Sequence, residues 1–524
     1  MSFSKVMSAQ TTLLSARIID IEIDLSKGLH SFTIVGLPDK GIEESKDRVG
    51  AAIKNSGYKS PKNKNQKVVV SLAPADLKKE GPLFDLPIAL AYLLASGDIV
   101  FDPAGKLFVG ELSLDGRIRP IQGVLALAQE ALKRKFNELY VPFENAREAA
   151  LIEGIRVYGV KNLKEVIEHI NTKKGEQSED KEESVSEKIP VTPKTTLAHK
   201  VSEDKIDFAD VIGQEGAKRG LEIAAAGRHN IVLYGPPGTG KTMLAEAFCH
   251  ILPPLSFPET LETTAIHSIA GTLRNHFVTN PPFRSPHHSA SYVSLIGGGA
   301  IPKPGEVTLA HRGVLFLDEF PEFDRKVIDS LREPLESRKV SISRARGSAL
   351  FPANFILIAA MNPCPCGNFG IVGKECSCSP IDISRYQRKI SGPIMDRIDM
   401  WVEVSRIDHK KLGEKNTATT SHSEKVKKNV IEARTIQKNR FEKLGLKIST
   451  NSEIPAKHLI DLAHLEEKAK HTLTLAAQKL DLSARAYHRI IKLARTIADL
   501  EKDSSVLEKH IYEALQYRPK KLTP

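Results

Sequence analysis

Hydrophobic and polar residues alternate with two different periods in the first 170 residues of the chain. A spacing of two predicts strands, and a spacing of three to four predicts amphipathic helices. The expected strands are Ala16–Asp24, Ser31–Val35, Val68–Leu72 and Glu138–Val141, and the expected helices are Ile42–Ser56, Asp85–Ser96 and Gly123–Lys135. Asp115-Gly116 is a tight-turn signal, so residues 107–120 should form a hairpin. This alternation predicts an α/β or α+β domain over residues 1–170.

The hydrophobic pattern stops between residues 171 and 205. This stretch is polar and charged, and it contains two prolines and few apolar residues. Because it cannot bury enough apolar surface to fold alone, we expect a flexible charged linker.

Buried-strand patterns resume after the linker. Continuous apolar runs at 231–234, 313–317 and 355–361 predict buried strands of an α/β core. Helical spacing then dominates the last hundred residues, at Leu459–Ala469, Thr472–Lys479, Ser483–Leu500 and Ser505–Leu515. We therefore expect an α/β domain at 206–405 and an all-helical lid domain at 406–524.

Charge and composition narrow the class of partner. The net charge of +11 favours a polyanionic partner such as nucleic acid, although many soluble proteins are mildly basic. The sequence contains no run of 18 apolar residues and no secretory signal pattern, so we expect a cytoplasmic protein without a membrane span.

The motif that carries most chemistry follows the apolar run 231–234. It fits the P-loop pattern G-x-x-x-x-G-K-[ST], in which backbone N–H groups close around phosphate oxygens. Its lysine reaches the β- and γ-phosphates and its threonine hydroxyl ligates Mg²⁺. The predicted binding site for ATP and Mg²⁺ comprises Gly235, Pro236, Pro237, Gly238, Thr239, Gly240, Lys241 and Thr242.

Two later strands end in polar side chains that suit the same site. Asp318 and Glu319 follow the run 313–317. Asp318 is expected to hold the Mg²⁺ shell, and Glu319 to orient or deprotonate the attacking water. Asn362 follows the run 355–361 and is a candidate to position water against the γ-phosphate, although this signal is weak in isolation.

Four of the five cysteines lie close together as Cys364, Cys366, Cys376 and Cys378. In a reducing compartment such a cluster predicts a metal site before it predicts disulfides. Four thiolates suit one tetrahedral structural Zn²⁺, although C-x-C is less usual than C-x-x-C and reduced free thiols are the alternative.

The order P-loop, Asp-Glu strand, Asn strand and helical lid is the pattern of AAA+ ATPases. Within that class the chain resembles the YifB/ComM family, of the magnesium-chelatase-like branch, over nearly its whole length except the linker. The motifs that carry the resemblance are Arg284–Ser291, Gly297-Gly-Gly, Ser391–Asp399, Leu482–Arg489 and Ala494–Leu500.

The resemblance implies further roles. Asn362 matches the sensor 1 position, Arg397 matches the arginine finger and Arg485 matches the sensor 2 arginine of the lid. An arginine finger acts on a neighbouring subunit's γ-phosphate, which implies a homo-hexameric ring. The alternative for either arginine is a surface salt bridge.

Two insertions are expected to project into the pore of that ring. Residues 267–305 fit a helix 2 insert, and residues 340–351 alternate like a hairpin before the sensor 1 strand. Arg344 and Arg346 would share a face of this hairpin, with Lys339 nearby, and could hold a DNA backbone without reading sequence. The alternative is a solvated hairpin with ordinary charges.

The first 170 residues resemble the Lon protease fold, through the segments 79–90, 110–117 and 120–124. Lon-like proteases use a serine–lysine dyad. Leu83 stands where the serine is expected, and Leu125 or a neighbour stands where the lysine is expected. We therefore expect a proteolytically inert domain.

The family resemblance implies an ATP-driven helicase that promotes DNA branch migration during natural transformation. Its expected partners are single-stranded and branched DNA, the other subunits of the hexamer and recombination proteins. The alternatives are a chelatase-type protein-remodelling ATPase and a regulatory ATP-dependent protease, because fold alone does not establish function.

Overall fold

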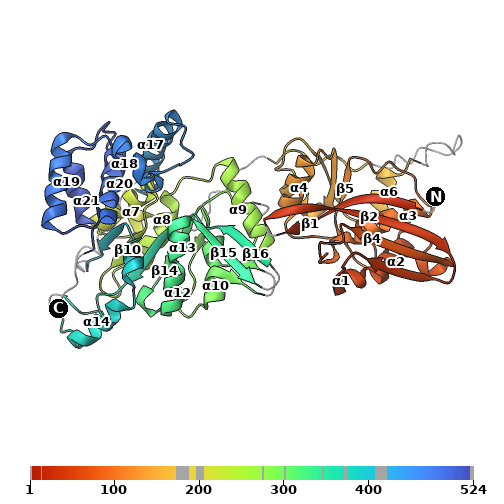
Figure 1. Cartoon of the computed structure of the whole chain (residues 1–524), viewed down its shortest axis with the longest axis horizontal. Coiled ribbons are helices and arrows are strands. Elements are labelled where there is room, and N and C mark those ends of the chain that lie inside the picture. Colours follow the sequence, from red (N-terminus) through yellow and green to blue (C-terminus); the bar gives the residue numbers. More distant parts are fainter. Residues whose placement is uncertain are drawn as a thin grey trace. The chain divides into compact units, whose positions relative to one another are not determined.

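The chain forms two compact units in the computed structural model (Figure 1). Unit 1 comprises Met1–Ala198 and Thr260–Val278, and unit 2 comprises His199–Glu259 and Thr279–Pro524. The structure describes residues 3–12, 14–172, 188–195, 206–273, 277–299, 302–344, 347–370, 374–406 and 422–519. Most of the linker predicted at 171–205 lies outside these ranges.

Unit 1 is built on a seven-stranded mixed sheet with the order β3-β4-β2-β1-β5-β8-β9. The central pairs β1–β2 and β2–β4 are antiparallel, and the pairs toward both edges are parallel. The strands are β1 (Phe3–Thr12), β2 (Ser15–Lys27), β3 (Ser31–Val35), β4 (Gln66–Ala73), β5 (Lys106–Phe108), β8 (Glu138–Pro142) and β9 (Arg156–Val160).

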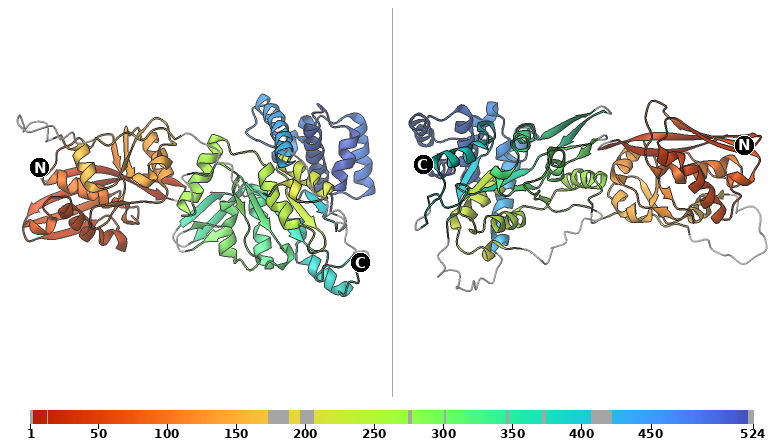
Figure 2. Two further views of the ribbon diagram at one scale, coloured as in Figure 1. Left: turned by 180° about the vertical axis from the view of Figure 1, so that it is seen from behind. Right: turned by 90° about the horizontal axis from the view of Figure 1, so that it is seen from below.

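Helices cover one face of this sheet (Figure 2). Buried and exposed residues alternate along β2 and β4, as expected for strands with one covered face. Helix α3 is almost entirely buried against β1 and β2. The helices of the unit are α1 (Lys40–Glu43), α2 (Ser45–Asn55), α3 (Asp85–Ala95), α4 (Val124–Lys133), α5 (Ala146–Ala149) and α6 (Leu163–Ile170), with the greater part of α9 (Phe257–Ile269).

Unit 1 departs from two expectations. The helix expected at 42–56 is two helices, because α1 ends at Glu43 and α2 begins at Ser45. Residues 107–120 do not form one hairpin: Leu107 belongs to β5, which pairs with β1 and β8, and the hairpin is confined to β6 (Glu111–Leu112) and β7 (Ile118–Arg119). Strands β1 and β9 have no counterpart among the predicted elements.

Unit 2 contains a five-stranded parallel sheet with the order β11-β14-β17-β10-β18. Every residue of β10, β14 and β17 is buried, as continuous apolar runs predict. The strands are β10 (Ile231–Tyr234), β11 (Phe283–Arg284), β14 (Val314–Leu317), β17 (Ile356–Met361) and β18 (Met400–Glu403). The α/β class is therefore confirmed for this part of the chain.

Smaller elements surround this sheet. Strands β15 (Lys339–Arg344) and β16 (Gly347–Pro352) pair as an antiparallel hairpin, and β12 (Gly297–Gly298) pairs with β13 (Lys303–Pro304). The helices of the α/β part are α7 (Glu215–Gly227), α8 (Lys241–Ile251), α10 (Tyr292–Ile296), α11 (Glu306–Leu309), α12 (Arg325–Ser330), α13 (Arg332–Ser337), α14 (Pro380–Arg388) and α15 (Gly392–Met395).

The C-terminal helices group together beside α7 and α8 (Figure 1). They are α17 (His422–Lys443), α18 (Ala456–Ala463), α19 (Glu467–Lys479), α20 (Ala484–Leu500) and α21 (Glu508–Gln516). The prediction of one helix at 459–469 is wrong, because the chain leaves the helix at His464, whose φ is +47°, and α19 begins at Glu467. Helix α19 includes the segment 472–479, which the pattern predicts as a separate helix.

Among the described residues, no helix is long and apolar enough to cross a membrane.

Candidate nucleotide site

The P-loop forms the turn between β10 and α8, at the carboxyl edge of the parallel sheet. Gly238 and Gly240 have φ of +74° and +87°, a left-handed conformation that favours glycine, and Gly240 is the residue before the first turn of α8. The Thr239 hydroxyl donates to the Pro236 carbonyl oxygen at 2.9 Å and so holds the turn closed. The first backbone N–H groups of α8 therefore point toward this edge of the sheet.

Lys241 lies folded against the P-loop itself. Its Nζ donates to the carbonyl oxygens of Gly235 and Pro236 at 2.8 and 2.7 Å, and to Oδ1 of Asn362 at 3.1 Å. Burial lowers the pKa of Lys241, because a charged amine loses hydration there. The structure thus brings together Lys241, which begins α8, and Asn362, which directly follows β17.

Thr242 and Asp318 are placed as two ligands of one small cation would be. The Thr242 hydroxyl lies 2.9 Å from Oδ2 of Asp318. Adjacent oxygen ligands of octahedral Mg²⁺, each about 2.1 Å from the metal, lie about 3.0 Å apart. The two side chains fit Mg²⁺ without rearrangement.

Glu319 is held by a histidine that the sequence did not single out for this purpose. Its backbone is left-handed, with φ of +49°, and its Oε2 lies 3.2 Å from Nδ1 of His288. The rings of His287 and His288 lie 4.1 Å apart, and both residues follow β11. The order of strands in the sheet brings His288 to Glu319, and one sequence does not reveal that order.

Arg397 and Arg485 lie together, away from the P-loop. Both pair with the carboxylate of Glu336: the Arg397 guanidinium contacts it directly, and Arg485 Nη2 lies 3.5 Å from Oε1. Arg397 holds the pKa of the Glu336 carboxyl below its usual range. All three residues line one pocket.

This pocket lies at the amino edge of the sheet. Asn230 directly precedes β10; its side-chain amide donates to the Arg397 carbonyl oxygen at 3.2 Å, and its backbone N–H donates to Asp399 at 3.0 Å. The path along β10 from Asn230 to Gly235 is about 16 Å at ~3.3 Å per residue, which exceeds the length of an arginine side chain. Arg397 therefore cannot reach the P-loop of its own subunit along this path.

The residues expected to bind DNA are only partly described. Lys339 begins β15 and is exposed. Arg344 ends β15, where its backbone pairs with Gly347, but its side chain is not described. Arg346 lies outside the described residues, so the prediction that it shares a face with Arg344 stays a prediction.

The four cysteines converge. Sγ of Cys364 lies 3.4 Å from Cys366 and 3.7 Å from Cys376, and Cys366 lies 3.5 Å from Cys376. All four sulfur atoms lie within 4.8 Å of one another, and none is in a disulfide. The cluster is compatible with Zn²⁺.

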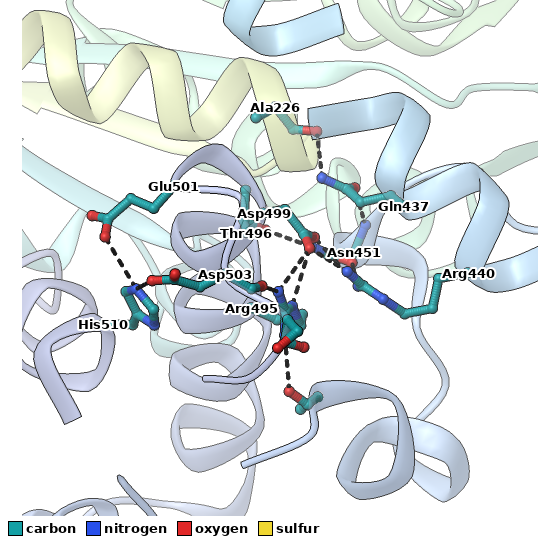
Figure 3. Close-up of polar contacts among 12 residues, drawn as sticks. Ala226, Gln437, Arg440, Asn451, Arg495, Thr496, Asp499, Glu501, Asp503 and His510 are labelled. Atoms are coloured by element: carbon teal, nitrogen blue, oxygen red, sulfur yellow. Dashed lines mark hydrogen bonds and ion pairs between the residues drawn. The ribbon is translucent and has the colours of Figure 1, made fainter. Parts of the chain in front are cut away.

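A second group contains residue types that often bind metals: Glu501, Asp503 and His510 (Figure 3). The hydrogen bonds and ion pairs of this group do not fit a metal site. His510 Nδ1 accepts the Leu507 backbone N–H at 3.0 Å, so the ring proton is on Nε2, which faces both carboxylates at 3.2 Å. Lys509 also pairs with both carboxylates, at 2.6 and 3.1 Å. The group is therefore an ion-pair cluster.

The two positions where a Lon-like dyad is expected carry apolar side chains within the core of unit 1. Leu125 is buried and Leu83 is half-buried against the same cluster. Near them, the Gly123 N–H donates to the Ser268 hydroxyl at 2.9 Å, and that hydroxyl donates to Glu148 at 2.7 Å.

Three family models match this chain. The model for magnesium chelatase, subunit ChlI, matches residues 207–412, and the model for subunit ChlI of Mg-chelatase matches 21–145. The model for the ChlI C-terminal part matches 420–518.

Relatives extend over the whole chain. Competence protein ComM of Haemophilus influenzae is 41% identical over 99% of this chain and 98% of its own length. YifB of Escherichia coli is 40% identical over 99% of this chain and 97% of its own. Lon protease 2 of Bacillus subtilis is 32% identical over 148 residues, 26% of each chain. The chain belongs to the YifB/ComM family of magnesium-chelatase-like AAA+ ATPases, and it combines Lon-like and AAA+ architecture.

Proposed function

We propose that this member of the YifB/ComM family is an ATP-driven DNA motor that acts as a hexameric ring and promotes branch migration. The observation that carries the proposal is the placement of Arg397 and Arg485 on the edge of the sheet opposite the P-loop. Two arginines on Glu336 at that edge are available to a neighbouring subunit, and a ring of subunits gives each P-loop one such neighbour.

Within one subunit, the P-loop binds the phosphates, and Thr242 and Asp318 hold Mg²⁺. Glu319 activates the attacking water, with His288 as the partner that sets the direction of its carboxylate. Asn362 acts as sensor 1, because it already contacts Lys241. The arginines of the next subunit stabilise the negative charge of the transition state.

The proposed substrate is single-stranded and branched DNA. The net charge of +11 supports a polyanion, and Lys339, Arg344 and Arg346 provide cations on one hairpin. The name of the Haemophilus influenzae relative, a competence protein, agrees with a role in natural transformation. Recombination proteins are the proposed further partners, and the cytoplasm is the proposed compartment.

We assign residues 1–170 to a Lon-like domain without the dyad, 171–205 to a linker, 206–405 to the AAA+ core with its helix 2 insert, and 406–524 to the helical lid. The proposed cofactors are Mg²⁺ and one structural Zn²⁺ at the four cysteines. The Lon-like domain serves assembly or binding, because leucine supplies neither a nucleophile nor a base.

Branch migration on three-strand and four-strand DNA junctions tests the proposal. The wild-type chain with ATP should convert the junctions. Lys241→Ala should neither bind ATP nor convert the junctions, and Glu319→Gln should bind ATP without turnover. Arg344→Ala with Arg346→Ala should weaken DNA binding and reduce its salt dependence while basal ATPase persists. ATP hydrolysis without any junction conversion would contradict the motor.

A chelatase-type remodelling ATPase is the second candidate, because all three matched family models describe ChlI. It predicts ATP hydrolysis that DNA leaves unchanged. Stimulation of turnover by forked DNA therefore separates the two candidates.

A further inference from the structure

The loop that carries the four cysteines lies directly against the P-loop, and this contact gives the cluster a second role. Three features of the loop bear on that role: the geometry of its sulfur atoms, the direction of its backbone N–H groups, and two glycines, Gly367 and Gly370.

The sulfur geometry matches a single tetrahedral ion. Four thiolates about 2.3 Å from Zn²⁺ lie about 3.8 Å from one another. The three separations among Cys364, Cys366 and Cys376, which are 3.4, 3.5 and 3.7 Å, are close to that value and far above the ~2.05 Å of a disulfide. The sulfur atoms are thus spaced as the ligands of one ion would be.

The backbone of the loop also turns toward the sulfur atoms. The Cys366 N–H points at Sγ of Cys378 at 3.4 Å, and the Phe369 N–H points at Sγ of Cys364 at 3.3 Å. Hydrogen bonds of this kind orient the ligands of a metal ion. Two turns of the loop therefore direct backbone N–H groups at sulfur atoms of the cluster.

One of these turns touches the nucleotide site. Gly367 has φ of +77°, and a Cβ added to it would lie 2.7 Å from Cδ of Pro237 in the P-loop. Such a separation is shorter than van der Waals contact, so the turn and the P-loop pack with no space for a side chain. Gly370 has nearly the same φ, +75°, but among the described residues an added Cβ there would meet no atom within 4 Å.

The same loop continues from the sensor residue and leads into a helix that returns to it. Cys364 lies two residues after Asn362, whose Oδ1 accepts from Lys241. After Cys378 the chain enters α14, and Tyr386 in that helix lies near the Asn362 backbone, which opposes the rise that burial causes in the pKa of Tyr386. Loop, sensor and P-loop therefore form one packed unit.

We propose that the cysteine cluster is a zinc-dependent clamp on the nucleotide site: Zn²⁺ fixes the turn at Gly367 against Pro237, and this contact holds the P-loop and Asn362 in their binding arrangement. The inference rests on the proposed ATPase and zinc. ATP affinity and turnover then depend on zinc although the metal touches no phosphate.

A pair of glycine substitutions tests the clamp in the full-length chain. Gly367→Ala and Gly370→Ala impose a similar left-handed backbone strain, but only the first adds a Cβ against Pro237. We expect both to retain about one Zn per chain by metal analysis. Gly367→Ala should lose at least tenfold in affinity for a fluorescent ATP analogue, and Gly370→Ala should stay within about twofold of wild type.

A second substitution keeps the test decisive if Gly367→Ala folds poorly. Pro237→Ala removes the Cγ and Cδ atoms that the new Cβ would meet, so the double variant with Gly367→Ala should recover ATP-analogue binding relative to Gly367→Ala alone. Equal losses in both glycine variants, or no recovery in the double variant, would overturn the contact.

Metal removal tests the zinc half of the inference. Cys364→Ser should contain less than about 0.2 Zn per chain and bind the ATP analogue at least tenfold more weakly. Wild-type protein without zinc, or a zinc-free variant with unchanged ATP affinity, would overturn the clamp. Both readouts are made without DNA, so an absence of branch migration contradicts the motor and leaves this inference intact.

Discussion

Glu336 holds the two arginines that the proposed mechanism needs at a neighbouring site. It is 59% exposed at the side chain, as is Arg485, whereas the Arg397 side chain is 15% exposed. An exposed ion pair contributes little to stability. The carboxylate does, however, compete with any phosphate for the same guanidinium groups. Glu336 therefore pairs with both arginines until an anion that binds them more strongly, such as a phosphate, displaces it.

Replacing Glu336 with Gln should make the arginines easier to recruit. We expect kcat/KM for ATP hydrolysis by the assembled protein to rise about two- to fivefold, because no ion pair must break. The unfolding midpoint should change little, since exposed pairs contribute ~0–1 kcal/mol. Glu333→Gln on the same helix is the matched control and should leave hydrolysis unchanged. Slower hydrolysis in Glu336→Gln would mean that the carboxylate positions the arginines productively.

At the scale of elements, the lid is joined internally by a buried network around α20 (Figure 3). Asp499 accepts from Arg495 of its own helix and from Arg440 of α17, and Asn451 donates to it at 2.8 Å. Gln437 of α17 donates to the Ala226 carbonyl oxygen of α7 at 3.3 Å. The network thus extends from α20 through α17 to the α/β part.

Asp499 is the carboxylate that lies between Arg440 and Arg495 in this network, and its side chain is fully buried. Asp499→Asn would leave two guanidinium groups without that charge, and breaking a buried pair costs about 3–5 kcal/mol. Urea unfolding should show a loss of that order. The exposed pair of Lys502 and Glu432 provides the control, because Glu432→Gln should leave stability almost unchanged. Equal effects of both substitutions would contradict the proposed importance of burial.

The sequence predicts the elements that have a strong apolar pattern. It does not predict the elements that form mainly because of their contacts with other parts of the fold. The runs that became β10, β14 and β17 are buried along their whole length. Helix α17 was missed, because its 22 residues bury only a narrow stripe and are otherwise polar. Strand β9 pairs only at the edge of the sheet, so its short sequence carries little signal. The nucleotide residues were identified by motif, whereas the contacts of His288 and Glu336 depend on the packing of segments that are distant in the chain.

At the scale of the whole molecule, the most informative feature is a segment that belongs to unit 1 although the residues on both sides of it in the sequence belong to unit 2. Residues 260–278 lie between the P-loop and Asp318 in sequence, yet they pack within unit 1. Ala265 is buried with the cluster around α4, and Ser268 links Gly123 to Glu148. No local pattern predicts such a contact, because the partners are more than a hundred residues apart in the chain.

Glu148 gives this packing a measurable pH dependence. Burial raises the pKa of Glu148 above its ordinary value of 4.5, although hydrogen bonds from Ser268 and Leu125 oppose the change. A raised folded pKa contributes stability that is fully present below pH 4.5 and is lost as pH rises through the folded pKa.

Because Gln does not titrate, Glu148→Gln should gain stability relative to wild type between pH 5 and pH 8. The gain should be about 1.4 kcal/mol for each pH unit by which the pKa of Glu148 in the folded protein exceeds its ordinary value. Urea unfolding of both proteins at the two pH values measures this difference. Ser268→Ala removes a hydrogen bond that favours the charged form, so it should enlarge the loss of stability with pH. A difference between wild type and Glu148→Gln that does not change with pH would mean that the carboxyl titrates normally, and that the contact between residues 260–278 and the rest of unit 1 opens easily to water.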